Sequence, residues 1–268
     1  GSWTLSFANS RKLGQREFVT VALIGVAFGA IDAVFNGKIY DWDLLNYRFY
    51  SVHAWLQGRV TDHIAPGQIQ TWLNPALYVP HYLLIQHAPP NVAAAILGAL
   101  VGLNIALVYA LARAVIRVRN PVWRVTMTML CVGVGVSDPS YRGELGSMAS
   151  DSLISHAVLG SLLVLSRNLA GLADGRARGR AFLFAGLLLG IGTGLKLTGI
   201  IYAAGMSASL LLVWLVFRFP GRWLAIFSLG GILGFVLTGG YWSWFLWREY
   251  GNPTFPYWNA VFQSPWIE

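Results

Sequence analysis

The stretch from Ala181 to Phe217 reads AFLFAGLLLGIGTGLKLTGIIYAAGMSASLLLVWLVF and contains one charged residue, Lys196. An apolar run of about 20 residues is long enough to cross the hydrocarbon core of a bilayer as a helix. The stretch therefore predicts two spans, Ala181–Gly194 and Leu197–Phe217, which meet at Lys196. A junction this short can lie below the membrane surface, where a charged side chain is costly and usually functional.

Similar apolar runs recur on both sides of this stretch. They bring the predicted number of spans to about seven, and the others are Phe18–Phe35, Val92–Ile116, Val122–Val136, Leu153–Leu169 and Trp223–Trp247. The composition agrees, because 56% of the residues are hydrophobic and only 11% are charged, about half the charged fraction of a soluble domain. We expect a single all-α transmembrane domain over residues 1–268, a polytopic helical bundle.

Basic residues predict the orientation of the bundle, because short loops rich in Lys and Arg stay in the cytoplasm. The apolar run Trp72–Gln86 is short and proline-bounded, so we expect it to be interfacial or re-entrant. With the N-terminus in the cytoplasm and this run not crossing, the 19 Lys and Arg divide 13 to 6 in favour of the inner side. The 13 are Arg11, Lys12, Arg16, Arg113, Arg117, Arg119, Arg124, Arg167, Arg176, Arg178, Arg180, Arg218 and Arg222.

This distribution explains the net charge of +8 by topology and by contact with anionic lipids, so nucleic acid is not expected as a partner. Acidic, aromatic and histidine residues gather instead in the three predicted outer segments, which are Asn36–Asn91, Ser137–Asp151 and the tail from Arg248. Function is therefore expected on the outer side. The single cysteine, Cys131, excludes a disulfide within the chain.

The first outer segment contains a predicted amphipathic helix that ends at Gly58. Its apolar face consists of Trp42, Leu45, Phe49, Val52 and Leu56, and its polar face of Asp43, Asn46, Tyr50, His53 and Gln57. Such a helix favours the membrane interface, with its polar face toward the aqueous mouth of the bundle. The candidate substrate-binding residues are Asn46, Tyr50, His53, Arg59, Asn74 and Lys196.

Carboxylates offer two kinds of chemistry on this side. Asp41 and Asp43 follow the first span, where either can accept a proton from a nucleophile or simply cap the helix. Asp138 and Glu144 can hold a hard cation, and Asp151 can do so or cap the next helix. The scattered histidines lack the spacing of a zinc site. Lys196 either binds a lipid phosphate or extends to the interface as a solvated lysine.

Several of these features together resemble the C-type (GT-C) membrane glycosyltransferases. They are Asp41 and Asp43 after the first span, Asn74-Pro75 in a long first outer loop, the acidic second loop, the Gly-Leu-Lys-Leu-Thr junction at Lys196, and the tail Tyr250-Gly251-Asn252-Pro253-Thr254-Phe255-Pro256-Tyr257-Trp258-Asn259. The resemblance implies a bacterial inner-membrane enzyme with its main loops in the periplasm. It would move a sugar from a polyprenyl-phosphate donor to an extracytoplasmic acceptor.

The resemblance also implies residue roles. Asp41 or Asp43 would be the catalytic base, Lys196 a phosphate contact, and Asp138 and Glu144 the ligands of a divalent cation, Mg²⁺ or Mn²⁺. The chain departs from the pattern in two places. Arg48 stands where relatives carry a histidine, and the chain ends at Glu268 where such enzymes continue. Either a C-terminal region is missing or only the shared module is kept.

Two other functions stay open. A non-catalytic subunit or scaffold of a larger membrane complex would use the aromatic faces to pack against lipids or protein partners. A small transporter is less favoured, because the spans contain few polar groups and no repeat is evident.

Overall fold

The computed structural model describes residues 14–37, 42–62, 67–148, 150–173, 178–218 and 220–267, and these contain helices but no strand. The longer helices are α1 (Gln15–Asn36), α4 (Pro90–Val115), α5 (Pro121–Ser137), α7 (Asp151–Ala173), α8 (Gly179–Leu195), α9 (Ile200–Phe217) and α10 (Arg222–Tyr250). The shorter ones are η1 (Leu44–Arg48), α2 (Phe49–Leu56), η2 (Gln68–Trp72), η3 (Pro75–Tyr78), α3 (Val79–His87), α6 (Pro139–Glu144), η4 (Leu197–Gly199) and α11 (Asn259–Phe262).

Five segments in the described part are long and apolar enough to cross a membrane. They lie in α1, α4, α7, η4 with α9, and α10, and α5 and α8 are apolar helices of 17 residues each. The all-α prediction is thus confirmed, and the helices fit a multi-pass membrane protein. Each of the seven predicted apolar runs corresponds to one of these helices.

Helices α8 and α10 are parallel neighbours that touch along a seam of glycines. A Cβ added at Gly186 or Gly190 would meet the backbone of α10 at Phe227 and Gly231, and one added at Gly194 would meet Thr238 and Gly239. Small residues four apart allow two helix backbones to approach closely within a membrane. We call this contact the α8–α10 seam.

Helices α1 and α4 form a second seam, in which the helices are antiparallel. Gly25 lies against Gly102, and Gly29 lies against Gly98 and Gly102, with backbone again facing backbone. At one end, Glu17 accepts a hydrogen bond from the Tyr109 hydroxyl and forms an ion pair with Arg113.

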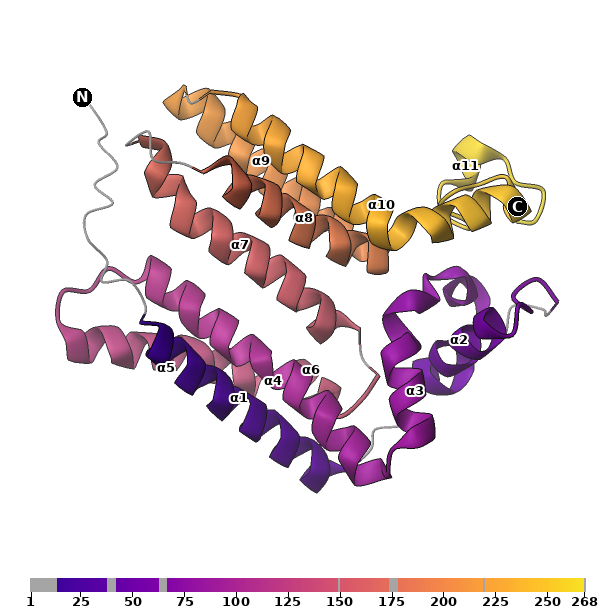
Figure 1. Cartoon of the computed structure of the whole chain (residues 1–268), viewed down its shortest axis with the longest axis horizontal. Helices are drawn as coiled ribbons and strands as arrows, with labels where there is room; N and C mark the ends of the chain where they lie inside the picture. Colours follow the sequence, from indigo (N-terminus) through magenta and orange to yellow (C-terminus); the bar gives the residue numbers. More distant parts are fainter. Residues whose placement is uncertain are drawn as a thin grey trace.

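Helix α7 lies between the two pairs and contacts both α4 and α8 (Figure 1). Its buried residues Ile154, Val158 and Leu165 join the largest apolar cluster of the core. Helix α9, in contrast, has one buried residue, Leu210. It is connected to α8 by η4 and to α10 by a short link, and most of its apolar surface is exposed.

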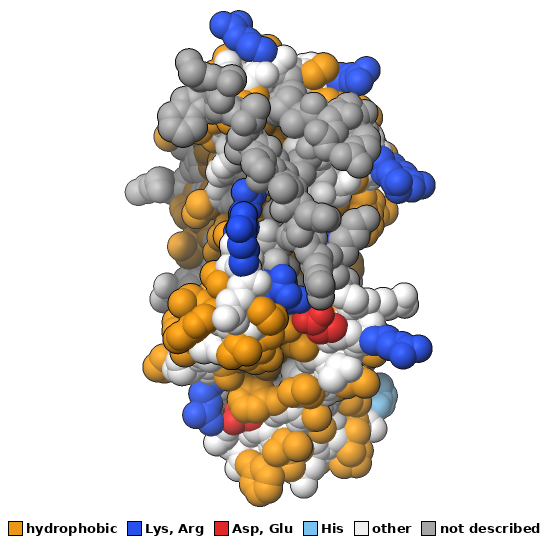
Figure 2. Space-filling view, turned by 90° about the vertical axis from the view of Figure 1, so that its left-hand side faces the viewer, with side chains coloured by type: hydrophobic (Ala, Val, Ile, Leu, Met, Phe, Trp, Pro, Cys, Tyr) orange, Lys and Arg blue, Asp and Glu red, His pale blue; other side chains and the backbone are white. Residues whose placement is uncertain are grey.

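The helix directions sort the basic residues by the end of the bundle at which they lie. One end carries the predicted inner residues Arg113, Arg117, Arg119, Arg124, Arg178, Arg180, Arg218 and Arg222. Figure 2 views this end, where blue side chains are spread widely and red ones are few. Lys196, Arg142 and Arg248 lie at the opposite end, so the arrangement groups the charges as the sequence predicts.

The predicted amphipathic helix is helical over residues 42–56 and contains the π-helical turn η1. Trp42, Leu45 and Leu56 of its predicted apolar face are exposed on the protein surface, whereas Val52 of that face is buried. Exposed apolar side chains are compatible with a position in the membrane interface, which stays a prediction. The predicted stop is confirmed, because Gly58 has a left-handed φ of 67°.

The run Trp72–Gln86 does not form one helix. It is divided into the end of η2, the short helix η3 and the nine-residue helix α3. Nine residues rise only about 14 Å, less than half of the hydrocarbon thickness. This agrees with the expectation that the run does not cross.

The α8–α10 seam yields a matched pair of substitutions. We expect Gly190→Leu to destabilise the protein by about 1–3 kcal/mol or more, because the new side chain meets backbone and not a movable side chain. Gly205→Leu, on the open face of α9, should change stability little. The melting temperature of each purified variant in the same detergent measures this. Equal melting temperatures for the two variants would contradict the seam.

Candidate functional site

A pocket lies at the end of the bundle away from the arginine-rich end, beside the C-terminus of α8. Four segments that are distant in the sequence line it, and they are 72–78, 193–197, 235–246 and 253–257. Its volume is about 50 Å³, room for a few water molecules or one small headgroup. Because α10 continues beyond the end of α8 (Figure 1), its last turns form one wall.

Lys196 extends along the edge of this pocket. Helix α8 stops at Leu195, and Lys196 itself is extended, with φ −142° and ψ 112°. Its Nζ donates to Asp151 Oδ1 at 2.6 Å and to Ser150 Oγ at 2.9 Å, which ties the end of α8 to the start of α7. The lysine side chain is 17% exposed and the aspartate 68%. A largely buried ammonium group thus has a solvated carboxylate as its partner.

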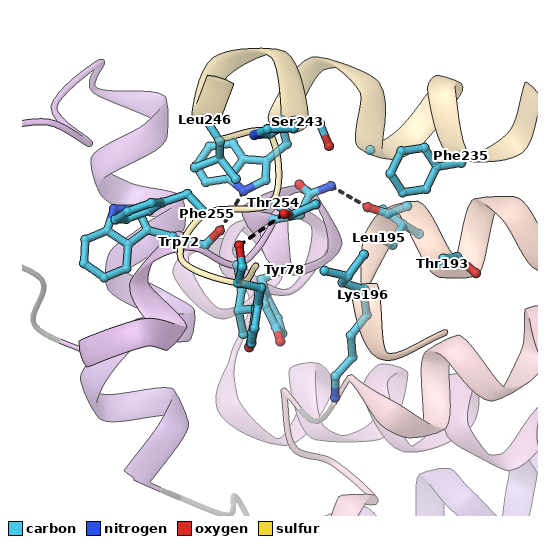
Figure 3. A pocket seen from close by; sticks show the side chains of 18 residues that line it. Trp72, Tyr78, Thr193, Leu195, Lys196, Phe235, Ser243, Leu246, Thr254 and Phe255 are labelled. Carbon is cyan, nitrogen blue, oxygen red and sulfur yellow. Dashed lines mark hydrogen bonds between the residues drawn. The ribbon is translucent and has the colours of Figure 1, made fainter. Parts of the chain in front are cut away.

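Aromatic side chains form much of the pocket wall. Trp72 packs edge-on against Phe255, with ring centroids 4.9 Å apart, and Trp242 Nε1 donates to the carbonyl oxygen of Trp72 at 2.8 Å. In Figure 3, Tyr78 and Lys196 extend toward the same side of the pocket. Sequence reasoning named Phe255 only as part of the tail motif and gave Trp242 and Tyr78 no role, since aromatic residues are common throughout this chain.

Asn74 lines the pocket and connects three parts of the chain through its side chain. Its Nδ2 donates to the carbonyl oxygens of Gly194 and Thr238, both at 2.9 Å, and its Oδ1 accepts from the backbone N–H of Ala76 at 3.0 Å. One side chain therefore joins the first outer segment to both helices of the α8–α10 seam. Every polar atom of its amide group takes part in these contacts.

Asp43 directly precedes the π-helical turn η1 and does not line the pocket. Its Oδ2 accepts from Arg48 Nη2 at 2.5 Å and from the Tyr47 hydroxyl at 3.0 Å. The i,i+5 spacing of the Arg48 pair matches the hydrogen-bonding period of a π-helix. Arg48 in turn lies over the ring of Tyr78, 5.9 Å from its centroid. Asp41, the alternative base, lies outside the described residues.

Burial of this cluster shifts its titratable groups. Burial raises the pKa of Tyr47 far above its ordinary value, so the hydroxyl stays a hydrogen-bond donor to Asp43. Burial, helped by the nearby Arg48 charge, lowers the pKa of His81 to about 4. His81 is therefore neutral near pH 7 and adds no second cation beside Arg48.

The remaining predicted substrate-binding residues do not line this pocket. Asn46 donates to the carbonyl oxygen of Trp42 at 2.7 Å, and His53 Nδ1 lies 2.9 Å from the Tyr82 hydroxyl. Arg59 pairs with Asp62 on the exposed surface at 3.5 Å. Tyr50 lies on α2, next to these residues and outside the pocket lining.

The predicted cation ligands act as helix caps. Asp138 Oδ1 accepts from the N–H of Ser140 at the start of α6, and Glu144 Oε2 accepts from the N–H of Ser152 at the start of α7. Among the described residues no three His, Cys, Asp or Glu side chains gather as a metal site. Asp151 carries a contact that sequence reasoning left open, the ion pair with Lys196.

The chain matches no protein-family model, no curated protein and no solved structure.

Asn74 and Asn46 both lie in the first outer segment, but only Asn74 connects this segment to α8 and α10. We expect Asn74→Ala to lower stability by about 2–4 kcal/mol, since it removes two hydrogen bonds to carbonyl groups and one cap. Asn46→Ala loses a single exposed contact and should cost about 0.5 kcal/mol or less. Thermal unfolding in detergent measures both. An Asn74→Ala protein that melts with the parent would remove the proposed connection.

Proposed function

We propose that the chain is an integral membrane glycosyltransferase that moves a sugar from a polyprenyl-phosphate donor to an extracytoplasmic acceptor. In this proposal the seven apolar helices span a bacterial inner membrane. The N-terminus and the arginine-rich end face the cytoplasm, and the pocket faces the periplasm. The basic end seen in Figure 2 supports this orientation through the positive-inside rule.

The observation that carries the proposal is the position of Lys196. Lys196 stands in the chain between two apolar helices, its side chain is only 17% exposed, and it lines the pocket. Its ammonium group bonds to Ser150 and Asp151 at the start of α7. A phosphate group of a lipid carrier can take the place of the Asp151 carboxylate, because both present anionic oxygens to the same donor. The exposed position of Asp151 makes this exchange inexpensive, since the carboxylate regains full hydration when it is released.

The chemistry of such a transfer needs a phosphate contact and a base. The acceptor hydroxyl or amine attacks the anomeric carbon, the bond from that carbon to the phosphate oxygen breaks, and the phosphate leaves on its carrier. The acceptor proton passes to a carboxylate, for which Asp41 and Asp43 are the candidates. Asp43 already accepts two hydrogen bonds, which favours Asp41 for this role.

A non-catalytic membrane subunit is the second candidate. The observation in its favour is that Asp43, Asn74, Asp138 and Glu144 all make hydrogen bonds that stabilise turns or helix ends. In that case the same pocket would hold a lipid without turnover.

The proposed contact between Lys196 and the phosphate of the lipid carrier can be tested by binding. In nanodiscs, Lys196→Met should weaken the binding of undecaprenyl phosphate about 10- to 100-fold, the value of one charge-assisted hydrogen bond. Binding of undecaprenol, which lacks the phosphate, should not change. Arg248→Met, which removes an exposed cation at the same end, is the matched control. Equal phosphate binding by the Lys196→Met and parent proteins would overturn the contact.

A measurement of turnover distinguishes an enzyme from a lipid-binding subunit. With sugar-loaded carriers and a membrane extract that supplies acceptor hydroxyls and amines, reconstituted parent protein should release undecaprenyl phosphate as the sugar passes to the acceptor. Asp41→Asn should lower this rate at least a hundredfold while undecaprenyl phosphate still binds. Asp43→Asn should mainly lower the melting temperature, because Arg48 loses its carboxylate partner. Full activity in both variants removes the proposed base, and binding without any turnover by the parent favours the subunit.

A further inference from the structure

The C-terminal segment Gly251–Ile267 contains no charged residue. It nevertheless presents large apolar side chains outward, since Trp258, Val261 and Trp266 are 68%, 67% and 69% exposed, and Phe262 is also exposed. A segment of this length on a water-facing surface would normally carry several charges. An exposed apolar patch of this kind marks a surface that meets a partner or a membrane.

The patch is held in place by two asparagine side chains. Asn252 accepts from the N–H of Thr254 at 2.9 Å and donates to the carbonyl oxygen of Tyr257 at 2.8 Å. Asn259 accepts from the N–H of Ser264 at 2.9 Å and donates to the carbonyl oxygen of Ile267 at 2.6 Å. The outward position of the apolar side chains is therefore fixed by the fold of the segment.

The opposite side of the segment packs on the bundle. Phe255 is buried, stacks on Tyr250 with ring centroids 4.4 Å apart, and contacts Trp72. Trp266 contacts the edge of Tyr250, with ring centroids 6.1 Å apart, and is otherwise largely exposed. The segment thus has one face packed on the bundle and one apolar face that is mostly exposed.

The length of α10 indicates what this face meets. Its 29 residues measure about 43 Å along the helix, which bends before its last turns (Figure 1), whereas the hydrocarbon core is about 30 Å thick. Its last turns therefore reach the level of the lipid headgroups, where the segment begins. Tyr241, Trp244 and Trp247 are exposed on these turns, and Trp and Tyr are the side chains enriched at that level. Arg248 lies 5.8 Å from the Trp244 ring centroid.

We propose that the face formed by Trp258, Val261, Phe262 and Trp266 inserts into the outer lipid interface as a membrane anchor. The occupant of the face is the phospholipid layer itself, with the aromatic rings at headgroup depth. Because Pro253, Thr254, Phe255 and Tyr257 of the same segment line the pocket, the anchor sets the pocket beside the lipid headgroups. This inference depends on the membrane position of α10 and not on sugar transfer.

The test uses the full chain in a Cys131→Ser background, so that one introduced cysteine carries an environment-sensitive fluorophore. The labelled variants are Val261→Cys and Trp258→Cys, and the matched control is Asp62→Cys, an exposed position in the first outer segment. Each is placed in nanodiscs of phosphatidylethanolamine and phosphatidylglycerol, with and without lipids that carry a doxyl quencher near the headgroup.

We expect blue-shifted emission and strong doxyl quenching at positions 258 and 261, and water-like emission without quenching at position 62. Water-like emission at both anchor positions would overturn the proposal. Blue-shifted emission without doxyl quenching would also overturn it, because a second copy, another protein or further chain would then cover the face. Size-exclusion profiles that match the parent establish that each labelled variant is folded.

Discussion

Direct contact between helix backbones is the constraint on which the rest of the bundle depends. In a membrane, apolar side chains gain little by leaving lipid for protein, so close packing and polar contacts must hold helices together. The two glycine seams provide such packing, one between α1 and α4 and one between α8 and α10. Helix α7 then joins the two pairs through larger apolar side chains.

The α8–α10 seam also fixes the pocket. It aligns the end of α8 with Gly239 of α10, so that the remaining turns of α10 project beyond α8. Asn74 bonds to carbonyl groups on both sides of this seam, and Lys196 bonds to the start of α7. A shift of the seam by one helical turn would therefore displace the first outer segment, the lysine and the aromatic wall together.

Much of the fold could be predicted from the sequence, because long apolar runs state where helices lie. The run Phe18–Phe35 corresponds to α1, and Trp223–Trp247 corresponds to α10. The π-helical turn of the first outer helix could not be predicted, since the apolar spacing of its sequence follows the regular 3.6-residue period. Lys196 could be found because it is a lone charge between apolar runs. The two hydrogen bonds from Asn74 to Gly194 and Thr238, far along the chain, leave no local signal in the sequence. Neither does the contact between Trp72 and Phe255.

Helix α9 differs from its neighbours in what its sequence must preserve. Only one of its residues, Leu210, is buried, so packing against the core constrains few of its side chains. Its substitutions should therefore follow the transfer free energy of each side chain into lipid, whereas those in α8 and α10 follow the volume of the side chain. The bundle thus contains helices that should tolerate substitution differently: α9 should accept Leu, Ile, Val or Phe at most of its positions, whereas the seam glycines should accept no larger side chain.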